Sequence, residues 1–156
     1  MKFTQSSRIA VRGGVILLVA LVLFHTSYSQ AAPTVQDKPF VTEHYYKVKW
    51  GYADEFLRLF KKNHYPLLKK HLDLGNALSI TAESPVHHGT EDSRWDYRIR
   101  ITWKNVQIAH DESGDEAILK QLFPNQEIFK REEQRRFEIL LAHWDVPVGS
   151  INLDEK

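Results

Sequence analysis

The feature that most constrains this chain is the alternation of residues 95–103, WDYRIRITW. In an extended chain, one face carries Trp95, Tyr97, Ile99, Ile101 and Trp103, and the other carries Asp96, Arg98, Arg100 and Thr102. Since successive side chains of a strand point to opposite faces, the pattern predicts a strand with one buried and one polar face. Strands of this kind form antiparallel sheets that are covered on one side. The rest of the chain therefore has to supply further strands and a covering layer.

Three further segments, residues 41–50, 77–83 and 143–148, also alternate and are predicted to be strands. Residues 53–74, 116–123 and 126–142 instead space their apolar side chains three and four apart, which is typical of helices. Pro66 lies within the first helical stretch and lacks an amide N–H, so we expect a kink or a break near Lys62. The order βαββαβ predicts a ferredoxin-like α+β sandwich: a four-stranded antiparallel sheet with the helices on one face.

The first 31 residues are predicted to be a cleaved export signal. Lys2, Arg8 and Arg12 precede an apolar run at residues 15–24, and Ser29 and Ala31 are small residues suited to the cleavage site. A retained membrane anchor is the alternative, but about ten residues at ~1.5 Å each span only about half of a ~30 Å hydrocarbon core. We therefore expect an exported protein, periplasmic or extracellular, without a membrane segment after cleavage.

The composition narrows the classes of partner. The chain contains no cysteine, so disulfides and a lipid-modified cysteine are not expected. Removal of residues 1–31, which carry three basic and no acidic residues, changes the formal net charge from +1 to −2. A nearly neutral chain of this kind lacks the large basic patch of a nucleic-acid-binding protein. We expect residues 32–39 to be a linker, residues 40–149 one domain and residues 150–156 a C-terminal tail.

The polar face of the predicted sheet is the first candidate binding surface. We expect it to carry Glu43, Tyr45, Lys47, Ser79, Thr81, Glu83, Asp96, Arg98, Arg100, His143 and Asp145. One interpretation is a solvated open sheet. The other is that two sheets meet across a twofold axis and enclose a partly polar chamber.

The candidate ligand-binding residues in such a chamber are Arg98, Arg100, Asp96 and Glu43. Planar guanidinium groups bind carboxylates and other oxyanions, and burial would require each of them to have a partner. The alternative is a set of ordinary ion pairs at the rim, worth about 0–1 kcal/mol each. Candidate proton-transfer groups are Tyr45, Tyr97, His143 and His64.

Histidines offer further candidate chemistry. His64 and His71 are seven residues apart and therefore lie on one helix face at a separation of ~10 Å. Either is a candidate axial haem ligand or proton-transfer group, or else a boundary residue with one hydrogen bond. His87 and His88 are candidate metal ligands because imidazole often binds zinc and copper, but a closed site needs three or four ligands. We expect no resident cofactor, with haem or a divalent metal as the alternative.

Two segments carry a family resemblance: FLRLFKKNHYPLLKKHLDLG, residues 56–75, and EEQRRFEILLAHWDVPV, residues 132–148. Together with the element order, they resemble the dimeric α/β-barrel superfamily, especially NIPSNAP, antibiotic-biosynthesis monooxygenase and stress-responsive barrel domains, over residues 40–149. The resemblance implies a homodimer whose two sheets close around a cavity. Some relatives oxidise aromatic polyketides without a cofactor, and some bind or degrade haem.

Three functional hypotheses follow. The first is an exported homodimer that binds a small anionic or aromatic molecule in its barrel. The second is an enzyme that uses the same chamber, either a cofactor-light monooxygenase or a haem-binding or haem-degrading protein. The third is a non-catalytic interaction module with a filled barrel.

Overall fold

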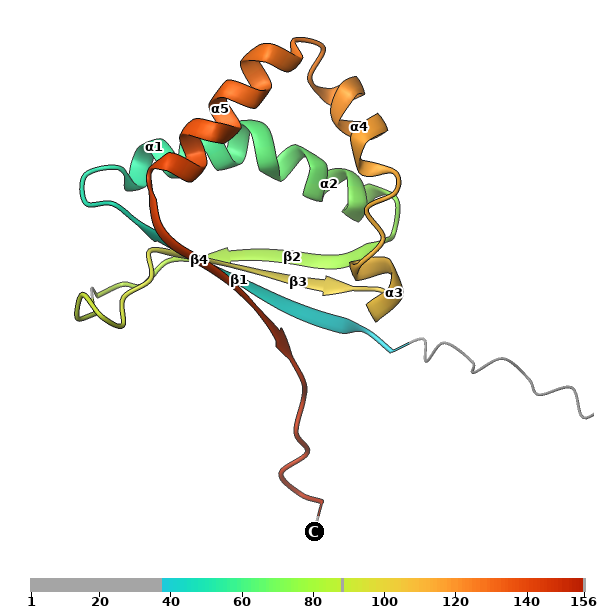
Figure 1. Cartoon of the computed structure of the whole chain (residues 1–156). Coiled ribbons are helices and arrows are strands. Elements are labelled where there is room, and N and C mark those ends of the chain that lie inside the picture. Colours follow the sequence, from blue (N-terminus) through green and yellow to red (C-terminus); the bar gives the residue numbers. More distant parts are fainter. Residues whose placement is uncertain (1–37, 88, 156) are drawn as a thin grey trace, which may run out of the picture. The chain divides into compact units, whose positions relative to one another are not determined.

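The computed structural model describes residues 38–87 and 89–155 (Figure 1). Its elements are β1 (Phe40–Val48), α1 (Ala53–Leu59), η1 (Phe60–His64), α2 (Tyr65–Asp73), β2 (Ala77–Glu83), β3 (Tyr97–Trp103), α3 (Val106–Ala109), α4 (Asp115–Leu122), α5 (Gln126–Glu138) and β4 (Leu140–Val148). This order confirms the predicted βαββαβ arrangement, with α4 at the helical stretch predicted for residues 116–123 and the short helix α3 in addition. The predicted export signal and residues 32–37 of the predicted linker lie outside the described residues. Among the described residues, none of the helices is long and apolar enough to span a membrane.

The four strands form one antiparallel sheet in the order β2-β3-β1-β4. The helices α1, α2, α4 and α5 lie on one side of this sheet, and the other side is open (Figure 1). In the ladder, His44 of β1 is opposite Ile99 of β3 and Asp145 of β4. Residues that face each other directly in a ladder point to the same side of the sheet. The helix-covered side of the sheet therefore includes His44, Ile99 and Asp145.

The core lies between this side of the sheet and the helices. Its buried residues include Val48, Phe56, Leu59, Ile101 and Ile139, each at most 2 % exposed. Full burial of an aliphatic or aromatic side chain contributes about 1.5–3 kcal/mol, so a cluster of this size fixes the helices on the sheet. Around it, aromatic rings of Tyr46, Phe56, Phe60 and Tyr97 contact one another.

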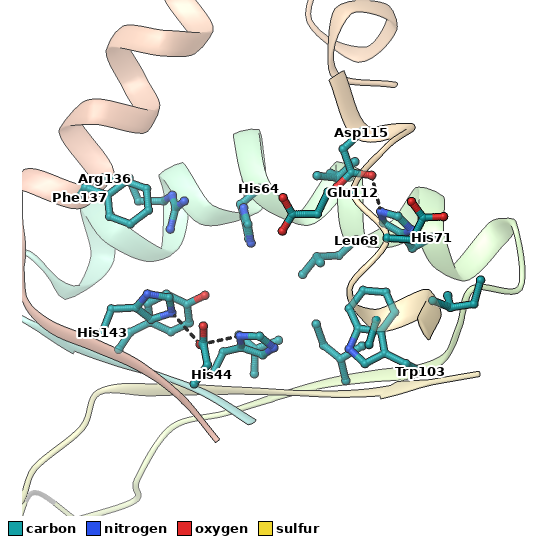
Figure 2. Close-up of a pocket in the computed structure, with 18 residues that line it drawn as sticks. His44, His64, Leu68, His71, Trp103, Glu112, Asp115, Arg136, Phe137 and His143 are labelled. Carbon is teal, nitrogen blue, oxygen red and sulfur yellow. Dashed lines mark hydrogen bonds and ion pairs between the residues drawn. The ribbon is translucent and has the colours of Figure 1, made fainter. Parts of the chain in front are cut away.

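The break expected at Pro66 is a change of helix type. Residues 60–64 form the π-helical turn η1, and the amide of Tyr65 donates to the carbonyl of Phe60, five residues earlier. Pro66 then lies in the first turn of α2, directly after η1, so its missing N–H removes one bond from the continuous helical stretch at the π turn. Single π turns inside α-helices are frequent at functional sites. Here the turn ends at His64, whose side chain points toward the sheet (Figure 2).

Candidate functional site

A cavity of about 250 Å³ lies between the helices and the sheet (Figure 2). Four of the eight histidines of the chain line it: His44, His64, His71 and His143. Its apolar wall is formed by Tyr46, Leu67, Leu68, Ile99, Ile101, Trp103 and Phe137. A mostly apolar cavity with a few converging polar groups is the usual form of a small-molecule site. The imidazoles therefore mark this cavity as the candidate functional site.

A second hollow, of about 520 Å³, lies beside β2 and contacts α1, η1 and α2. It is larger, but Lys61 and Glu83 are its only lining residues with a formal charge, and Tyr65, Leu57 and Ile80 form much of its wall. It lacks the converging polar side chains that orient a ligand. The cavity lined by the histidines is therefore the better candidate site, because of its polar side chains and despite its smaller volume.

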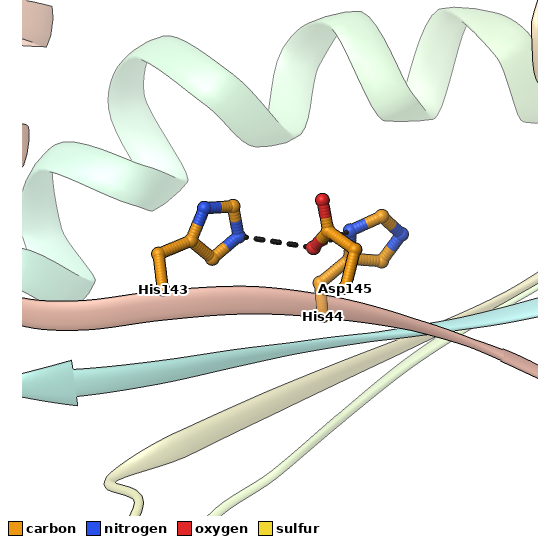
Figure 3. Close-up of side chains that lie close together, drawn as sticks. All are labelled: His44, His143 and Asp145. Carbon is orange, nitrogen blue, oxygen red and sulfur yellow. Dashed lines mark hydrogen bonds and ion pairs between the residues drawn. The ribbon is translucent and has the colours of Figure 1, made fainter.

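Two histidines in the cavity converge on one carboxylate, and we name this group the His–Asp–His cluster: His44, Asp145 and His143 (Figure 3). The Nδ1 atom of His44 lies 2.6 Å from Oδ1 of Asp145, and Nε2 of His143 lies 3.1 Å from the same oxygen. The ladder explains the convergence, since His44 is directly opposite Asp145 and His143 precedes Asp145 by two residues on the same strand. Sheet register therefore positions all three side chains.

The His–Asp–His cluster is held from behind by polar and aromatic contacts. The hydroxyl Oγ1 of Thr42 lies 2.9 Å from Nε2 of His44 and accepts a hydrogen bond from the indole of Trp103 at 3.0 Å. The ring of His143 stacks on that of Tyr46, with centroids 4.4 Å apart and planes 12° from parallel. Both imidazoles therefore have defined orientations. Burial, helped by Arg136 and His44 and opposed by Asp145, lowers the pKa of His143.

His64 is the third imidazole that points into the cavity (Figure 2). Burial, together with the nearby positive charge of Arg136, lowers its pKa from 6.5 to about 3. His64 is therefore neutral near pH 7, where it can donate one hydrogen bond and accept another. The guanidinium of Arg136, also in the cavity wall, is only 2 % exposed and is bound by both carboxylate oxygens of Glu133 at 2.8 and 3.0 Å.

His71 closes the opposite end of the cavity. Its Nε2 lies 3.0 Å from Oδ1 of Asp115 and its Nδ1 lies 3.3 Å from Nδ2 of Asn76. The ring also meets Trp103 edge to face, with centroids 5.6 Å apart. Both ring nitrogens of His71 thus have protein partners, and the residue links α2 to α4.

The open side of the sheet carries the predicted arginine cluster. Glu43 accepts hydrogen bonds from Arg100 at 2.6 Å and from the Tyr45 hydroxyl at 2.6 Å, and Arg98 lies 3.6 Å away. The hydrogen bonds from Tyr45 and Arg100, together with the nearby charge of Arg98, lower the pKa of Glu43. Arg98 also donates to Glu83 at 3.0 Å. The structure therefore brings together Arg98, Arg100, Glu43 and Tyr45, and their charges are already paired.

Three residues predicted for this polar face lie elsewhere, so their assignment was wrong. Asp96 precedes β3 and accepts hydrogen bonds from the amide of Val48 and from Arg94, both at 2.6 Å. His143 and Asp145 point to the helix side because the ladder sets them opposite Tyr46 and His44. In place of these two, β4 presents Trp144 and Val146 on the open side, 39 % and 37 % exposed.

The other residues singled out in the sequence lie apart from one another in the structure. Tyr97 packs in the core, stacked on Phe56, and donates to the carbonyl of Ala53 at 3.1 Å. Trp95, expected on the buried face, instead meets Tyr45 edge to face with centroids 5.6 Å apart. His87 is exposed in the loop after β2, and His88 lies outside the described residues. Within the described residues, the one group of three or more close metal-ligating side chains is the His–Asp–His cluster.

Sequence reasoning missed the His–Asp–His cluster, although part of its signal was present. His44 alternates in phase with Tyr46 and Val48, both of which are buried, so its place on the helix side follows from the pattern. The orientation of β4 does not follow from the pattern. Its alternating apolar residues Trp144 and Val146 favour the opposite orientation, with His143 and Asp145 on the open side. Only the pairing of β4 with β1 reveals that Asp145 meets His44.

Comparisons with known proteins support the fold. No protein-family model matches the chain, and no curated protein matches it. A solved dimeric ferredoxin-like protein from an uncultured marine organism superposes with a TM-score of 0.50 at 8 % identity, covering 76 % of this chain and 96 % of that one. An uncharacterised NIPSNAP domain protein from Burkholderia xenovorans has a TM-score of 0.41 at 14 % identity, covering 75 % and 99 %.

A further solved structure is that of SnoaB, a cofactor-independent oxygenase from Streptomyces nogalater, with a TM-score of 0.43 at 10 % identity over 75 % of this chain and 98 % of that one. These neighbours include classes that the sequence was found to resemble. The first comparison and the strand order together confirm the predicted fold. The chain has the ferredoxin-like α+β fold seen in dimeric ferredoxin-like proteins.

Proposed function

We propose that the protein binds a small aromatic molecule with a polar substituent in the cavity between its helices and its sheet. The observation that carries the proposal is the convergence of His44, His64 and His143 on a hollow with an apolar wall (Figure 2). The aromatic side chains Trp103 and Phe137 offer surfaces for a ring, and the imidazoles of His64 and His143 offer donors and acceptors for a hydroxyl or carboxyl group. The site thus differs from the chamber between sheets that the sequence favoured.

The size of the cavity limits its occupant. Pockets for drug-sized ligands measure about 300–1,000 Å³, and this one measures about 250 Å³. A molecule of one or two rings suits that volume, whereas a porphyrin does not. The cavity therefore favours a small aromatic ligand over haem, the alternative that the histidines suggested.

The open side of the sheet suits a second copy of the chain. Trp144 and Val146 form an apolar strip there, with Tyr45 stacked on Trp144 at 5.2 Å between ring centroids. Beside this strip lie Arg98 and Arg100. In a twofold dimer the same surface meets itself, so the aromatic strip of one protomer can cover the arginines of the other, a favourable cation–π arrangement.

The structural neighbour from an uncultured marine organism is described as a dimeric ferredoxin-like protein, which also favours a dimer. We therefore propose that the protein is a homodimer with one ligand cavity in each protomer. We also propose that it is exported, because residues 1–31 have the charge and hydropathy pattern of a signal peptide.

Ligand binding can be tested with 2-naphthol and 4-hydroxybenzoate as probes, titrated while tryptophan fluorescence is measured. Leu68 lines the cavity, so Leu68→Trp should fill it and abolish binding. Leu78 is exposed on β2, and Leu78→Trp is the matched control that should bind normally. If Leu68→Trp bound the probes as well as Leu78→Trp does, the cavity would not be the site. The same conclusion would follow if the unchanged chain bound neither probe.

Dimer formation can be tested separately by light scattering at micromolar concentration. Val146→Asp places a charge in the apolar strip of the open sheet and should give monomers. Val86→Asp, at a position that is 92 % exposed in a loop, is the matched control and should remain dimeric. A monomeric unchanged chain would rule out the proposed dimer without affecting the cavity.

A further inference from the structure

The His–Asp–His cluster has a geometry that ligand binding alone does not require. Two imidazole nitrogens lie 2.6 and 3.1 Å from a single carboxylate oxygen, and one ligand atom from each of the three residues falls within 4.8 Å of the others. We propose that His44, His143 and Asp145 bind a divalent transition-metal ion of the first row. The inference goes beyond the proposed function, because ion binding can occur and be measured without an organic ligand.

The separations suit one ion. Zinc binds histidine nitrogen and carboxylate oxygen at ~2.0–2.2 Å with tetrahedral angles, so two ligand atoms on the same ion lie ~3.4 Å apart. The two measured distances are somewhat shorter than that value, and all three ligand atoms lie within 4.8 Å of one another. Small rotations of the three side chains would therefore centre them on an ion, with no change in the backbone.

The backbone already holds the three residues in place. His143 and Asp145 are two apart on β4 and share a face, and the β1–β4 ladder sets His44 opposite Asp145 (Figure 3). Sites built on paired strands position ligands more precisely than sites on loops. Little conformational entropy remains to be lost when the ion binds.

The contacts behind His44 are those of a metal ligand. A metal-bound histidine usually donates its second ring N–H to an oxygen, which fixes the tautomer. Thr42 Oγ1 lies 2.9 Å from Nε2 of His44, and its other acceptor position is filled by the indole N–H of Trp103. When Nε2 of His44 carries the proton and donates it to Thr42, Nδ1 is left bare toward Asp145, as ligation requires.

The charge of the cavity also favours a cation. Its lining carries four carboxylates against one guanidinium: Asp111, Glu112, Asp115 and Asp145 against Arg136. Arg136 is in turn paired with Glu133. With no basic side chain other than Arg136 and the imidazoles in the wall, the cavity has a net negative charge that attracts a divalent ion.

The ligand set indicates the class of ion and its use. Two imidazoles and one carboxylate suit zinc, iron(II), cobalt or manganese, and three protein ligands leave coordination positions open, as in catalytic and not structural sites. These positions would face the cavity, where an oxygen of a bound aromatic molecule can reach them. The metal would thus orient a hydroxyl or carboxyl group as a Lewis acid.

The test uses the full-length chain, freed of metal with a chelator and titrated with Co²⁺ by visible absorption and with Zn²⁺ by calorimetry. We expect one ion per chain, with Zn²⁺ displacing Co²⁺ and abolishing its absorption. Asp145→Asn and His44→Gln should each weaken binding at least tenfold. Thr42→Val, which removes the hydroxyl behind His44, should weaken it about 10–100-fold.

The controls are His110→Gln and His87→Gln, which change histidines outside the cavity and should leave affinity unchanged. Circular dichroism melts identify any variant that does not fold, and the Co²⁺ spectrum of the unchanged chain does not depend on the variants. No Co²⁺ absorption in the unchanged chain, or equal affinity in the folded Asp145→Asn and His44→Gln variants, would overturn the inference. If the chain bound 2-naphthol but no ion, the metal site would be rejected and the proposed function kept. If it bound the ion but not 2-naphthol, the proposed function would be rejected and the metal site kept.

Discussion

Both sides of the sheet carry charged and polar residues, but the two sides differ in the hydrogen-bond and ion-pair partners that these residues have. On the open side, Arg98 and Arg100 each lie in ion pairs with Glu43, whose carboxylate also accepts from Tyr45. On the helix side, His44 and His143 compete for one oxygen of Asp145 beside a cavity. Paired charges stabilise a surface, whereas convergent groups beside a hollow can still bind something. This difference is the reason for proposing the site on the helix side.

The largest expected effect concerns the open side. Glu43 is buried with three partners, so Glu43→Ala leaves Arg98, Arg100 and Tyr45 without their common acceptor. We expect the free energy of unfolding to fall by about 2–4 kcal/mol, measured by urea denaturation. Glu83→Ala, which removes one more exposed partner of Arg98, should cost less than about 1 kcal/mol. Equal effects of the two variants would contradict a structural role for the Glu43 network.

A pH-dependent effect is expected from the helix side. The pKa of His64 is lowered to about 3 in the folded protein, from 6.5. Between these values the unfolded chain binds a proton that the folded chain does not, so stability should fall as the pH drops from 6.5 toward 3. The free energy of unfolding, measured by urea denaturation at pH 7 and pH 4.5, should therefore fall by about 1–3 kcal/mol less in His64→Leu than in the unchanged chain.

The matched control for this pH effect is His110→Leu, which changes an exposed histidine and should retain the full pH dependence. If His64→Leu were as acid-sensitive as the unchanged chain, His64 would not be held neutral in the cavity wall.

The smallest effect on stability is expected at Asp145, whose side chain is 53 % exposed. Asp145→Asn should change the free energy of unfolding by less than about 1 kcal/mol in the metal-free protein, because exposed ion pairs contribute little. The same variant should lose Co²⁺ binding. A large loss of stability would instead give the His–Asp–His cluster the structural role that the Glu43 network has on the open side.

Much of the fold was predictable because it depends on local pattern. The alternation of Tyr97, Ile99 and Ile101 correctly predicted β3 and its buried face, and Pro66 correctly marked the break in the first helix. The ion pairing of Arg98 and Arg100 with Glu43 also followed from sharing one face of neighbouring strands.

The site was less predictable because it depends on long-range register. In β4, Trp144 and Val146 are the apolar residues, so hydrophobicity alone directs them to the core and turns His143 and Asp145 outward. The ladder reverses this orientation, with an irregularity at Lys47 and Val48 that changes the register of β4. The proposed dimer would cover the exposed Trp144, which links this error to that proposal.

The central claim, that the site lies on the helix side of the sheet, can be tested by the indole N–H signals in a ¹⁵N–¹H correlation spectrum. Trp103 lines the cavity, and Trp144 lies on the open side. On titration with 2-naphthol, the account predicts that the Trp103 signal shifts and the Trp144 signal stays in place. A shift of Trp144 with Trp103 unchanged would contradict it and return the site to the face between two sheets.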